Sequence, residues 1–393
     1  VQNAIPINEH GRLDSCNVYG VNKSFEECRS WVYDTKYYSS SRGIEWDLVC
    51  SRRWMGAAAQ TAYMFGVVVG SVVLGRLCDK LGRKTIFVWS GVLQLAFGIA
   101  VAFTTEYYTF VAVRFLYGIF GSGSYIAGFV LTMELVGPSR RTVCGVTFQI
   151  MFAIGIMLLA AWGYLLDNRF YLQILYALHA AILLPHWLVM DESPRWLWAQ
   201  GRARESVAII EKALKMNKSN ETVDTPSLVS QCKVACAKYS DEHSAGTFDL
   251  FKTPNMLKKT LIICGCWFAN SVVYYGLSLN TGKLNGNPYF IMFLMGVVEL
   301  PYVINMYYLD RVGHRALISV MMLLGGVSCL AVVALPHGST STTGVVMLGK
   351  LFISGSYSII YKYSAELFPT VVRSSGVGLG SMCASVSGAL TAC

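Results

Sequence analysis

The sequence predicts an all-α membrane protein whose helices form two related halves, and three observations lead to that prediction. Of the 393 residues, 54% are hydrophobic and only 14% are charged. The hydrophobic residues gather into uncharged runs of roughly 20 residues, the length that crosses a bilayer as a helix. Two different polar motifs each recur at nearly the same distance along the chain, which indicates a duplicated unit.

The apolar runs predict about ten membrane spans and, with them, the domain organisation. We expect spans at 54–74, 85–105, 108–133, 143–166, 170–190, 259–279, 289–309, 316–336, 344–365 and 374–393. Residues 1–53 then form a loop, 54–190 a first bundle, 191–258 a polar linker with short helices, and 259–393 a second bundle. A large soluble protein is the alternative, but it would have to bury all these helices in series.

Basic residues are concentrated in every second loop between the expected spans. The loops 75–84, 134–142, 309–315 and 366–373 contain nine Lys or Arg residues, whereas the alternate short loops contain only Arg169 and Lys283. The positive-inside rule therefore places the first set in the cytoplasm and residues 1–53 outside the cell. The net charge of +9 is then a topology signal, and we expect no nucleic-acid partner.

The N-terminal loop carries features of an extracellular segment. Cys16, Cys28 and Cys50 can form disulfides in an oxidising compartment, and their odd number leaves the pairing open. Asn22 begins an Asn-Lys-Ser glycosylation acceptor. No His or carboxylate cluster accompanies the cysteines, so we expect no metal and no cofactor. No hydrolase or redox arrangement is present in the sequence, which argues against an enzyme.

The duplicated motifs define the two halves. "DKLGRK" at 79–84 and "DRVGHR" at 310–315 are 231 positions apart. "ELVGPSRRT" at 134–142 and "ELFPTVVRS" at 366–374 are 232 positions apart. Two unrelated loops that share one offset indicate homologous halves. Paired halves of membrane helices are an architecture of secondary transporters, in which the substrate site lies at the midplane between them.

Several segments resemble a known family. "GRLCDKLGRK" is similar to the signature loop of the major facilitator superfamily. The similarity to its organic cation, carnitine and organic anion transporter family rests on "EWDLVC", "ESPRWL", "YYGLSLNT", "VVELP" and "SAELFPTVVRSSGVG". The resemblance implies a major facilitator fold with two pseudo-symmetric bundles. On that template the chain holds helices 2–6 and 7–11, and helices 1 and 12 are missing.

The charged decamer 75–84 is interpreted as half of a latch between the bundles. We expect Gly75 to let two helices approach closely, as small residues do in membranes. Asp79 can accept hydrogen bonds from the N-terminus of a helix in the opposite half. Arg83 can pair with Glu134, and Arg141 can join them. Asp310, Arg311, Arg315, Glu366 and Arg373 repeat this set in the second half. The alternative is that these charges only set the topology.

An aromatic face marks the expected substrate path. Tyr125, Phe129 and Met133 are spaced four residues apart and share one face of a helix. The resemblance implies that this face and Tyr274 contact substrate, and plain packing is the alternative. Aromatic faces suit ammonium groups through cation–π attraction. Two polar residues, Gln149 and Ser358, complete the expected cavity lining.

Charged residues inside the apolar runs indicate the substrate class. Glu299 lies deep in its expected span, and an intramembrane carboxylate is a functional candidate. Lys350 lies in another span, nearer the outer end. The resemblance implies a charge-selecting position at Ser385, where cation transporters carry Asp and anion or carnitine transporters carry Arg. That residue is neutral here. Glu299 favours a cation or a zwitterion, and Lys350 tolerates a carboxylate.

The sequence therefore predicts a plasma-membrane transporter of small organic cations or zwitterions that works by alternating access. Its expected partners are the substrate, the bilayer and a coupling ion, H+ or Na+. A sugar or organic-anion porter of the same superfamily is one alternative. A non-transporting membrane sensor or scaffold is another.

Overall fold

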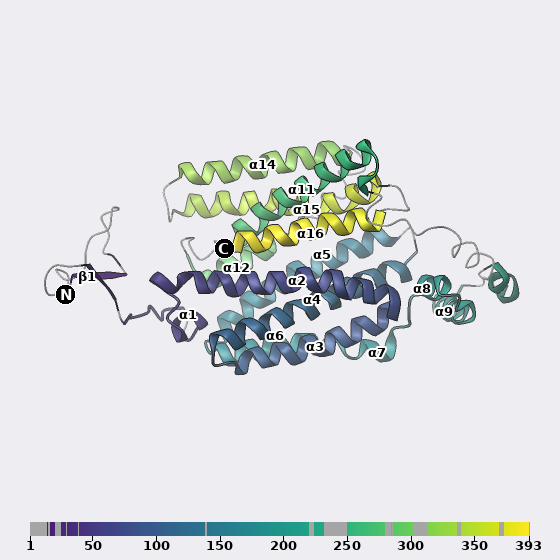
Figure 1. Cartoon of the computed structure of the whole chain (residues 1–393), viewed down its shortest axis with the longest axis horizontal. Helices are drawn as coiled ribbons and strands as arrows, with labels where there is room; N and C mark the ends of the chain where they lie inside the picture. The colour runs from purple at the N-terminus through teal and green to yellow at the C-terminus, as the bar shows by residue number, and fades with distance from the viewer. Residues whose placement is uncertain are drawn as a thin grey trace.

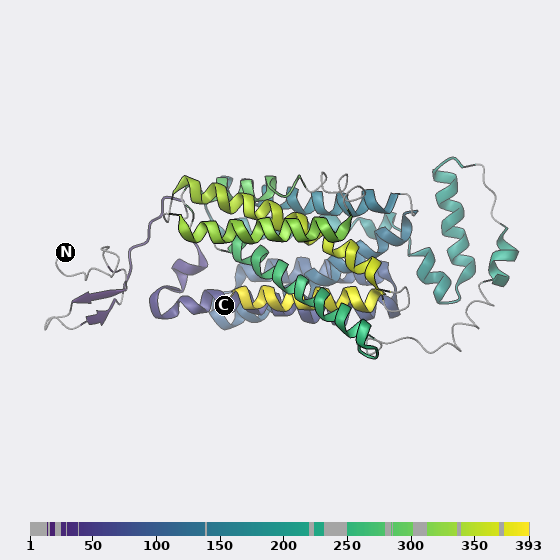
Figure 2. The same cartoon turned by 90° about the horizontal axis from the view of Figure 1, so that it is seen from above.

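The computed structural model forms one long helical bundle with small appendages at its two ends (Figures 1 and 2). It describes residues 14, 16–19, 25–28, 30–37, 39–137, 140–219, 224–231, 250–279, 284, 286–301, 313–335, 339–368 and 373–392. A β-hairpin projects beyond one end, which we call the hairpin end. Helices α8 (Pro194–Ala199) and α9 (Ala203–Met216) lie beyond the other, which we call the linker end.

The first half contains five of the expected spans. Its elements are α2 (Arg53–Leu81), α3 (Arg83–Phe103), α4 (Tyr107–Leu135), α5 (Arg141–Leu165) and α6 (Arg169–Leu178), which continues through the short helices η4 (His179–Leu183) and α7 (His186–Val189). The second half packs beside it, with α16 against α2. Its elements are α11 (Pro254–Leu279), α12 (Pro288–Val297), α14 (His314–Ala334), α15 (Thr340–Leu367) and α16 (Arg373–Ala392).

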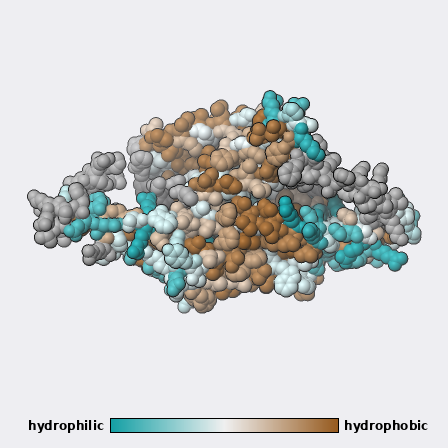
Figure 3. Space-filling view, in the orientation of Figure 1, coloured by the Kyte–Doolittle hydropathy of each residue, from teal (hydrophilic) through white to brown (hydrophobic). Residues whose placement is uncertain are grey.

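The predicted all-α membrane fold is confirmed. Among the described residues, eight helices are long and apolar enough to cross a membrane, and α12 and most of α16 are shorter apolar helices. Hydrophobic side chains cover the middle of the face shown in Figure 3, while hydrophilic ones gather toward both ends. This band is the distribution that a bilayer requires of a spanning bundle.

The described part of one expected span contains a break in the helix. We expect a helix over 289–309, but α12 ends at Val297. The backbone then tightens, because the N–H groups of Glu299 and Leu300 donate to the carbonyls three residues before them. Pro301 explains the break, since it has no N–H to donate to the carbonyl of Val297 and its ring would collide with that carbonyl. Glu299 therefore lies in a turn rather than inside a helix.

A second boundary also differs from the prediction. The segment 75–84 was expected to be a loop, yet α2 continues through its charged residues to Leu81. The helix ends where Gly82 adopts φ = +102°, a conformation that disfavours side chains. Gly75 and Asp79 consequently lie on the last turns of a helix, and α3 begins directly at Arg83.

Glycines bring α2 and α4 into close contact. A Cβ added to Gly66 or Gly70 would lie 2.2 or 2.3 Å from a backbone carbonyl oxygen of α4. A Cβ on Gly118 would lie 2.5 Å from the carbonyl oxygen of Tyr63. Around Gly75, by contrast, no described atom lies within 4 Å of that position. The expected close approach at Gly75, which concerned the latch between the two bundles, stays a prediction.

One disulfide links the two ends of the described N-terminal segment. Strands β1 (Asn17–Tyr19) and β2 (Phe25–Glu27) pair antiparallel, with Val18 opposite Glu26. Cys16 and Cys50 are disulfide-bonded, whereas Cys28 is free and donates its backbone N–H to the carbonyl of Cys16. The bond joins the hairpin to the short helix η2 (Cys50–Arg52), which leads into α2.

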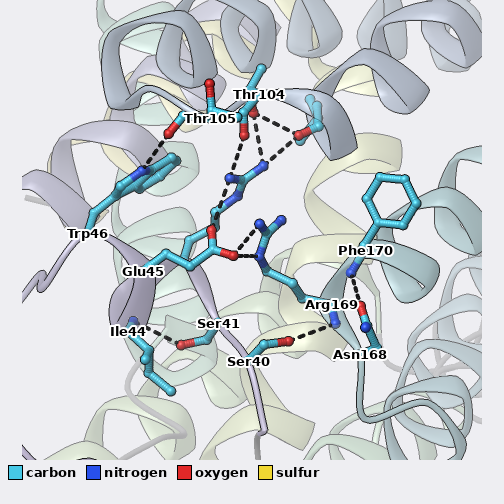
Figure 4. A network of polar contacts seen from close by, with 12 residues as sticks. Ser40, Ser41, Ile44, Glu45, Trp46, Thr104, Thr105, Asn168, Arg169 and Phe170 are labelled. Carbon is cyan, nitrogen blue, oxygen red and sulfur yellow. Dashed lines mark hydrogen bonds and ion pairs between the residues drawn. The ribbon is translucent and has the colours of Figure 1, made fainter.

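A polar network attaches this segment to the first half (Figure 4). Arg42, at the start of α1 (Arg42–Glu45), donates to the carbonyl oxygens of Thr104 and Val101 at 2.6 and 2.8 Å. Glu45 of the same helix forms an ion pair with Arg169 at the start of α6. Burial, and next the neighbouring Arg169, lower the pKa of the Arg42 guanidinium. The network thus holds α1 against the hairpin-end termini of α3 and α6.

We expect Gly70→Ala to destabilise the protein by about 1–3 kcal/mol, because its methyl group would force α2 away from α4. Gly75→Ala is the matched control on the same helix. It should leave stability unchanged or raise it by up to about 1 kcal/mol, since Ala favours helices. Thermal unfolding of the detergent-solubilised variants checks both results. Equal midpoints for the two variants would contradict the glycine-mediated packing.

Candidate functional site

The most unusual feature of the interior is a buried ion pair in the second half. Lys350 of α15 and Glu299, in the turn after α12, are each only 2% exposed. The ammonium nitrogen Nζ of Lys350 lies 3.3 Å from Glu299 Oε1. Removing one partner of such a pair leaves an uncompensated buried charge and costs several kcal/mol.

Helix α11 supplies the remaining contacts of this pair. The Tyr274 hydroxyl donates to Glu299 Oε1 at 2.6 Å. Lys350 Nζ lies 3.2 Å from the centroid of the Tyr274 ring and donates to Ser278 Oγ at 2.5 Å. Tyr274 and Ser278 are four residues apart and so share one face of α11. The other carboxylate oxygen, Glu299 Oε2, is buried and has no hydrogen-bond partner among the described residues.

Aromatic side chains extend from this ion pair. The Tyr274 ring lies 5.6 Å from that of Tyr357 on α15, which lies 5.7 Å from that of Trp267 on α11. Lys350 and Tyr357 are seven residues apart, two turns of the same helix face. Tyr357 was not among the predicted site residues, although its spacing from Lys350 and its residue type could have indicated it.

A second aromatic group lies on the first half. Tyr125 and Phe129 of α4 stack at 6.4 Å, and both contact the ring of Phe148 on α5. Tyr125 also interacts electrostatically with Tyr275 of α11 and Tyr357 of α15. Of the predicted aromatic face of α4, Tyr125 therefore lies near tyrosines of the other half, while Phe129 packs on Phe148 of its own half.

The other predicted lining residues also lie on described helices. No hydrogen bond between them and the Lys350–Glu299 pair is observed among the described residues. Met133 lies against α5, where its methyl carbon is 3.0 Å from the Cβ position of Gly145. Gln149 is half-buried on α5. Ser358 Oγ donates to the carbonyl of Gly355, and Ser385 Oγ donates to that of Ser381. Both serines thus bond within their own helices.

At the linker end, Arg83 is the centre of a charge cluster. Its guanidinium binds both carboxylate oxygens of Glu134, at 3.1 and 3.3 Å, and lies 3.0 Å from Asp79. The Asp79 side chain is 74% exposed, and its recorded partner is Arg83 rather than a helix of the opposite half. The predicted pairing of Arg83 with Glu134 is present. Among the described residues Asp79 has no recorded contact with a helix of the opposite half, so its predicted role stays a prediction.

The cluster includes residues that sequence reasoning did not assign to it. The Glu192 carboxylate accepts the backbone N–H groups of Arg83 and Lys84, at the start of α3. Trp196 donates its indole N–H to the carbonyl of Asp79 at 2.7 Å. An acidic group at a helix N-terminus satisfies free N–H donors and complements the helix dipole. The "ESPRWL" segment therefore fastens the linker to the turn between α2 and α3.

The repeated cluster of the second half lies largely outside the described residues. Asp310 and Arg311 are among the residues that the structure leaves undescribed, as is Asn22 in the N-terminal segment. Of Arg141, Glu366 and Arg373 only the backbone, inside α5, α15 and α16, is described. Arg315 is exposed near the start of α14. The second half of the predicted latch therefore stays a prediction.

The halves contact each other near the hairpin end. Thr61 of α2 donates to the carbonyl of Ala389 on α16 at 3.2 Å. Tyr289 of α12 packs edge-on against Tyr164 of α5 and donates to the carbonyl of Tyr37. At the linker end, Gly75 has open space and Asp79 is exposed. Within the described part of the chain, the recorded cross-half bonds thus favour the hairpin end.

No group of three or more His, Cys, Asp or Glu side chains among the described residues could hold a metal ion. What the site offers instead is a paired carboxylate and ammonium beside tyrosine rings, with one carboxylate oxygen open. Such a set can bind ionic groups of a small molecule.

Residues 16–393 match the family model described as sugar (and other) transporter. The chain is 40% identical over 373 residues to the "organic cation transporter protein" of Drosophila melanogaster, covering 92% of this chain and 67% of that protein. This chain belongs to the organic cation transporter family of the major facilitator superfamily. The predicted family is thereby confirmed.

Two further relatives are similar to most of this chain. It is 35% identical to human solute carrier family 22 member 16, over 92% of this chain and 63% of that protein. It is 34% identical to a Drosophila melanogaster beta-alanine transporter, over 91% of this chain and 59% of that protein. The chain spans about two thirds of the length of the curated relatives it matches.

Solved structures agree on the fold. The inward-open xylose transporter XylE from E. coli superposes with a TM-score of 0.63 at 14% identity, covering 91% of this chain and 82% of that one. At that identity the similarity supports the major facilitator fold alone. The two halves of the predicted fold are thus confirmed independently of the sequence motifs.

Glu192→Gln should lower the free energy of unfolding by about 1–2 kcal/mol, because the start of α3 loses a charged acceptor. Glu205→Gln is the control, since Glu205 pairs with Arg202 on the exposed face of the linker. Thermal unfolding in detergent should separate the two variants. If Glu192→Gln is as stable as Glu205→Gln, the carboxylate does not stabilise the α2–α3 turn.

Proposed function

We propose that this protein carries small organic cations or zwitterions across the plasma membrane by alternating access of its two halves. The observation that carries the proposal is the buried Glu299, whose second carboxylate oxygen has no described partner. A desolvated carboxylate is stabilised by a positive group, and Lys350 supplies one in the described state. A substrate ammonium can replace it. Two relatives, an organic cation transporter and a beta-alanine transporter of Drosophila melanogaster, support this class of substrate by their names.

The orientation in the membrane forms part of the proposal. Residues 1–53 lie outside the cell and residues 191–258 inside. Two observations support this orientation: the basic residues of alternate loops, and the Cys16–Cys50 disulfide in the segment assigned to the oxidising side. Glycosylation of Asn22 belongs to the same proposal.

The Arg83 cluster serves as a latch that acts on the conformational balance. Its ion pairs join α2, α3 and α4 at the cytoplasmic end, where a closed state would bring the second half near. The open position at Gly75 leaves room for such an approach. A coupling ion, H+ or Na+, is an additional partner, and the ionisable groups around Glu299 provide a place for a proton.

The experiment that tests the substrate class is uptake of labelled amines, carnitine and sugars into oocytes that express the full-length protein. Glu299→Gln should reduce amine uptake by about tenfold or more and affect neutral solutes much less, because only charged substrates depend on the carboxylate. Surface expression of both proteins normalises the result. Wild-type apparent affinity for amines in Glu299→Gln would mean that the carboxylate is structural.

Ser385 provides an independent check on selectivity. Ser385→Asp should improve cation uptake, and Ser385→Arg should suppress it and favour anions, because each adds one charge on α16. Competition between labelled amine and carboxylate probes measures the change. If both variants keep wild-type selectivity, Ser385 does not occupy the charge-selecting position that the family resemblance implies.

Breaking the latch should open the cytoplasmic side more often. Glu134→Gln removes the carboxylate that holds Arg83 and should increase the labelling of cytoplasm-facing cysteines by a membrane-impermeant thiol reagent applied to inside-out vesicles. Glu205→Gln serves as the control. Unchanged labelling at equal expression would leave these charges with a topological role only.

A further inference from the structure

Building on the proposed function, we infer that Lys350 and Glu299 form a two-point site for zwitterions. The substrate ammonium takes the place of Lys350 at Glu299, and the substrate carboxylate takes the place of Glu299 at Lys350. Both side chains are 2% exposed and lie 3.3 Å apart in the described state. In the absence of substrate, Lys350 and Glu299 therefore occupy the positions that the substrate's ammonium and carboxylate would take.

The need to keep each buried charge paired with an opposite charge selects this class of substrate. A cation that displaced Lys350 would leave an ammonium buried without a counter-charge. An anion that displaced Glu299 would leave a carboxylate in the same condition. Unpaired buried charges are strongly unfavourable, whereas an exchange of pairs keeps each charge compensated. A molecule that carries both signs separates Lys350 from Glu299 without such a cost, so among the proposed substrates the site favours zwitterions over simple cations.

The contacts around the pair provide for this exchange. Glu299 Oε2 is buried without a described partner, so it can accept an N–H before Oε1 gives up Lys350. Ser278 Oγ and the Tyr274 ring contact Lys350 Nζ in addition to Glu299, and they can keep it in place when the carboxylate turns to the substrate. The Tyr274 hydroxyl retains Glu299 Oε1 in the same way.

The fold itself does not require an ion pair at this position. With the offsets of 231 and 232 residues between the halves, Glu299 corresponds to Val68 of α2 and Lys350 to Gly118 of α4. In the first half, Gly118 packs directly against the backbone of α2. A valine and a glycine thus fill the equivalent place in the repeat, and the charges are specific to the second half.

The test compares three matched probes on the full-length protein. β-Alanine is the zwitterion, its methyl ester the cation and N-acetyl-β-alanine the anion, and carnitine with its methyl ester provides a second skeleton. Wild type should take up the zwitterions in preference to both singly charged forms. Lys350→Met should raise the uptake ratio of ester to zwitterion by about tenfold or more. Glu299→Gln should shift the ratio toward the anion.

Two further variants keep the result interpretable. Lys212→Met, on the exposed Lys212–Asp191 pair, should leave all ratios unchanged. Should a single variant fail to reach the surface, the double variant Glu299→Gln with Lys350→Met leaves no unpaired charge and should lose discrimination among the probes. The thermal stabilisation of purified wild type by each probe gives a second readout, and the zwitterion should stabilise most.

The outcomes separate this inference from the proposed function. Unchanged ratios in Lys350→Met, or a wild type that takes up esters but neither zwitterion, would overturn the two-point site and leave cation transport standing. A wild type at the surface that takes up no amine and no zwitterion would overturn the proposed function as well.

Discussion

A charged side chain among lipid-facing helices must be neutralised inside the protein, and the arrangement of this molecule follows from that constraint. The two described charge clusters lie at breaks in the helices. Arg83 follows Gly82, where α2 ends with a positive φ, and Glu299 precedes Pro301, where α12 has ended. Helix ends carry backbone groups without intrahelical partners, so charged side chains there can be combined with backbone donors. Glu192 does so for the start of α3.

The sequence was sufficient for the features that depend on local pattern. Apolar runs located the spans, and the duplicated motifs located the halves. The pairing of Arg83 with Glu134 also followed from the motifs, because both ends of the pair stand at helix termini on one side of the membrane. These inferences succeed because periodicity and charge placement are properties of short segments.

Features that depend on tertiary contacts were missed. The role of Glu192 could not be predicted from spacing, because its partners at the start of α3 lie more than a hundred positions away. The close approach of α2 and α4 at Gly66, Gly70 and Gly118 was not predicted, since a glycine-rich helix offers several candidate faces. Lys350 was expected nearer the outer end, yet its ammonium nitrogen lies 3.3 Å from Glu299 Oε1 of another segment.

The two halves share one arrangement of helices and differ in the side chains that they direct toward each other. The first half contributes aromatic rings, with Tyr125, half of whose surface is exposed, stacked on Phe129. The second half contributes the Lys350–Glu299 ion pair, and there the ammonium of Lys350 already lies over the Tyr274 ring. An apolar wall opposite a polar one lowers the local dielectric without removing the counter-charges, which strengthens each ionic contact. The duplication therefore supplied the scaffold, and the divergence of the halves supplied the chemistry of the site.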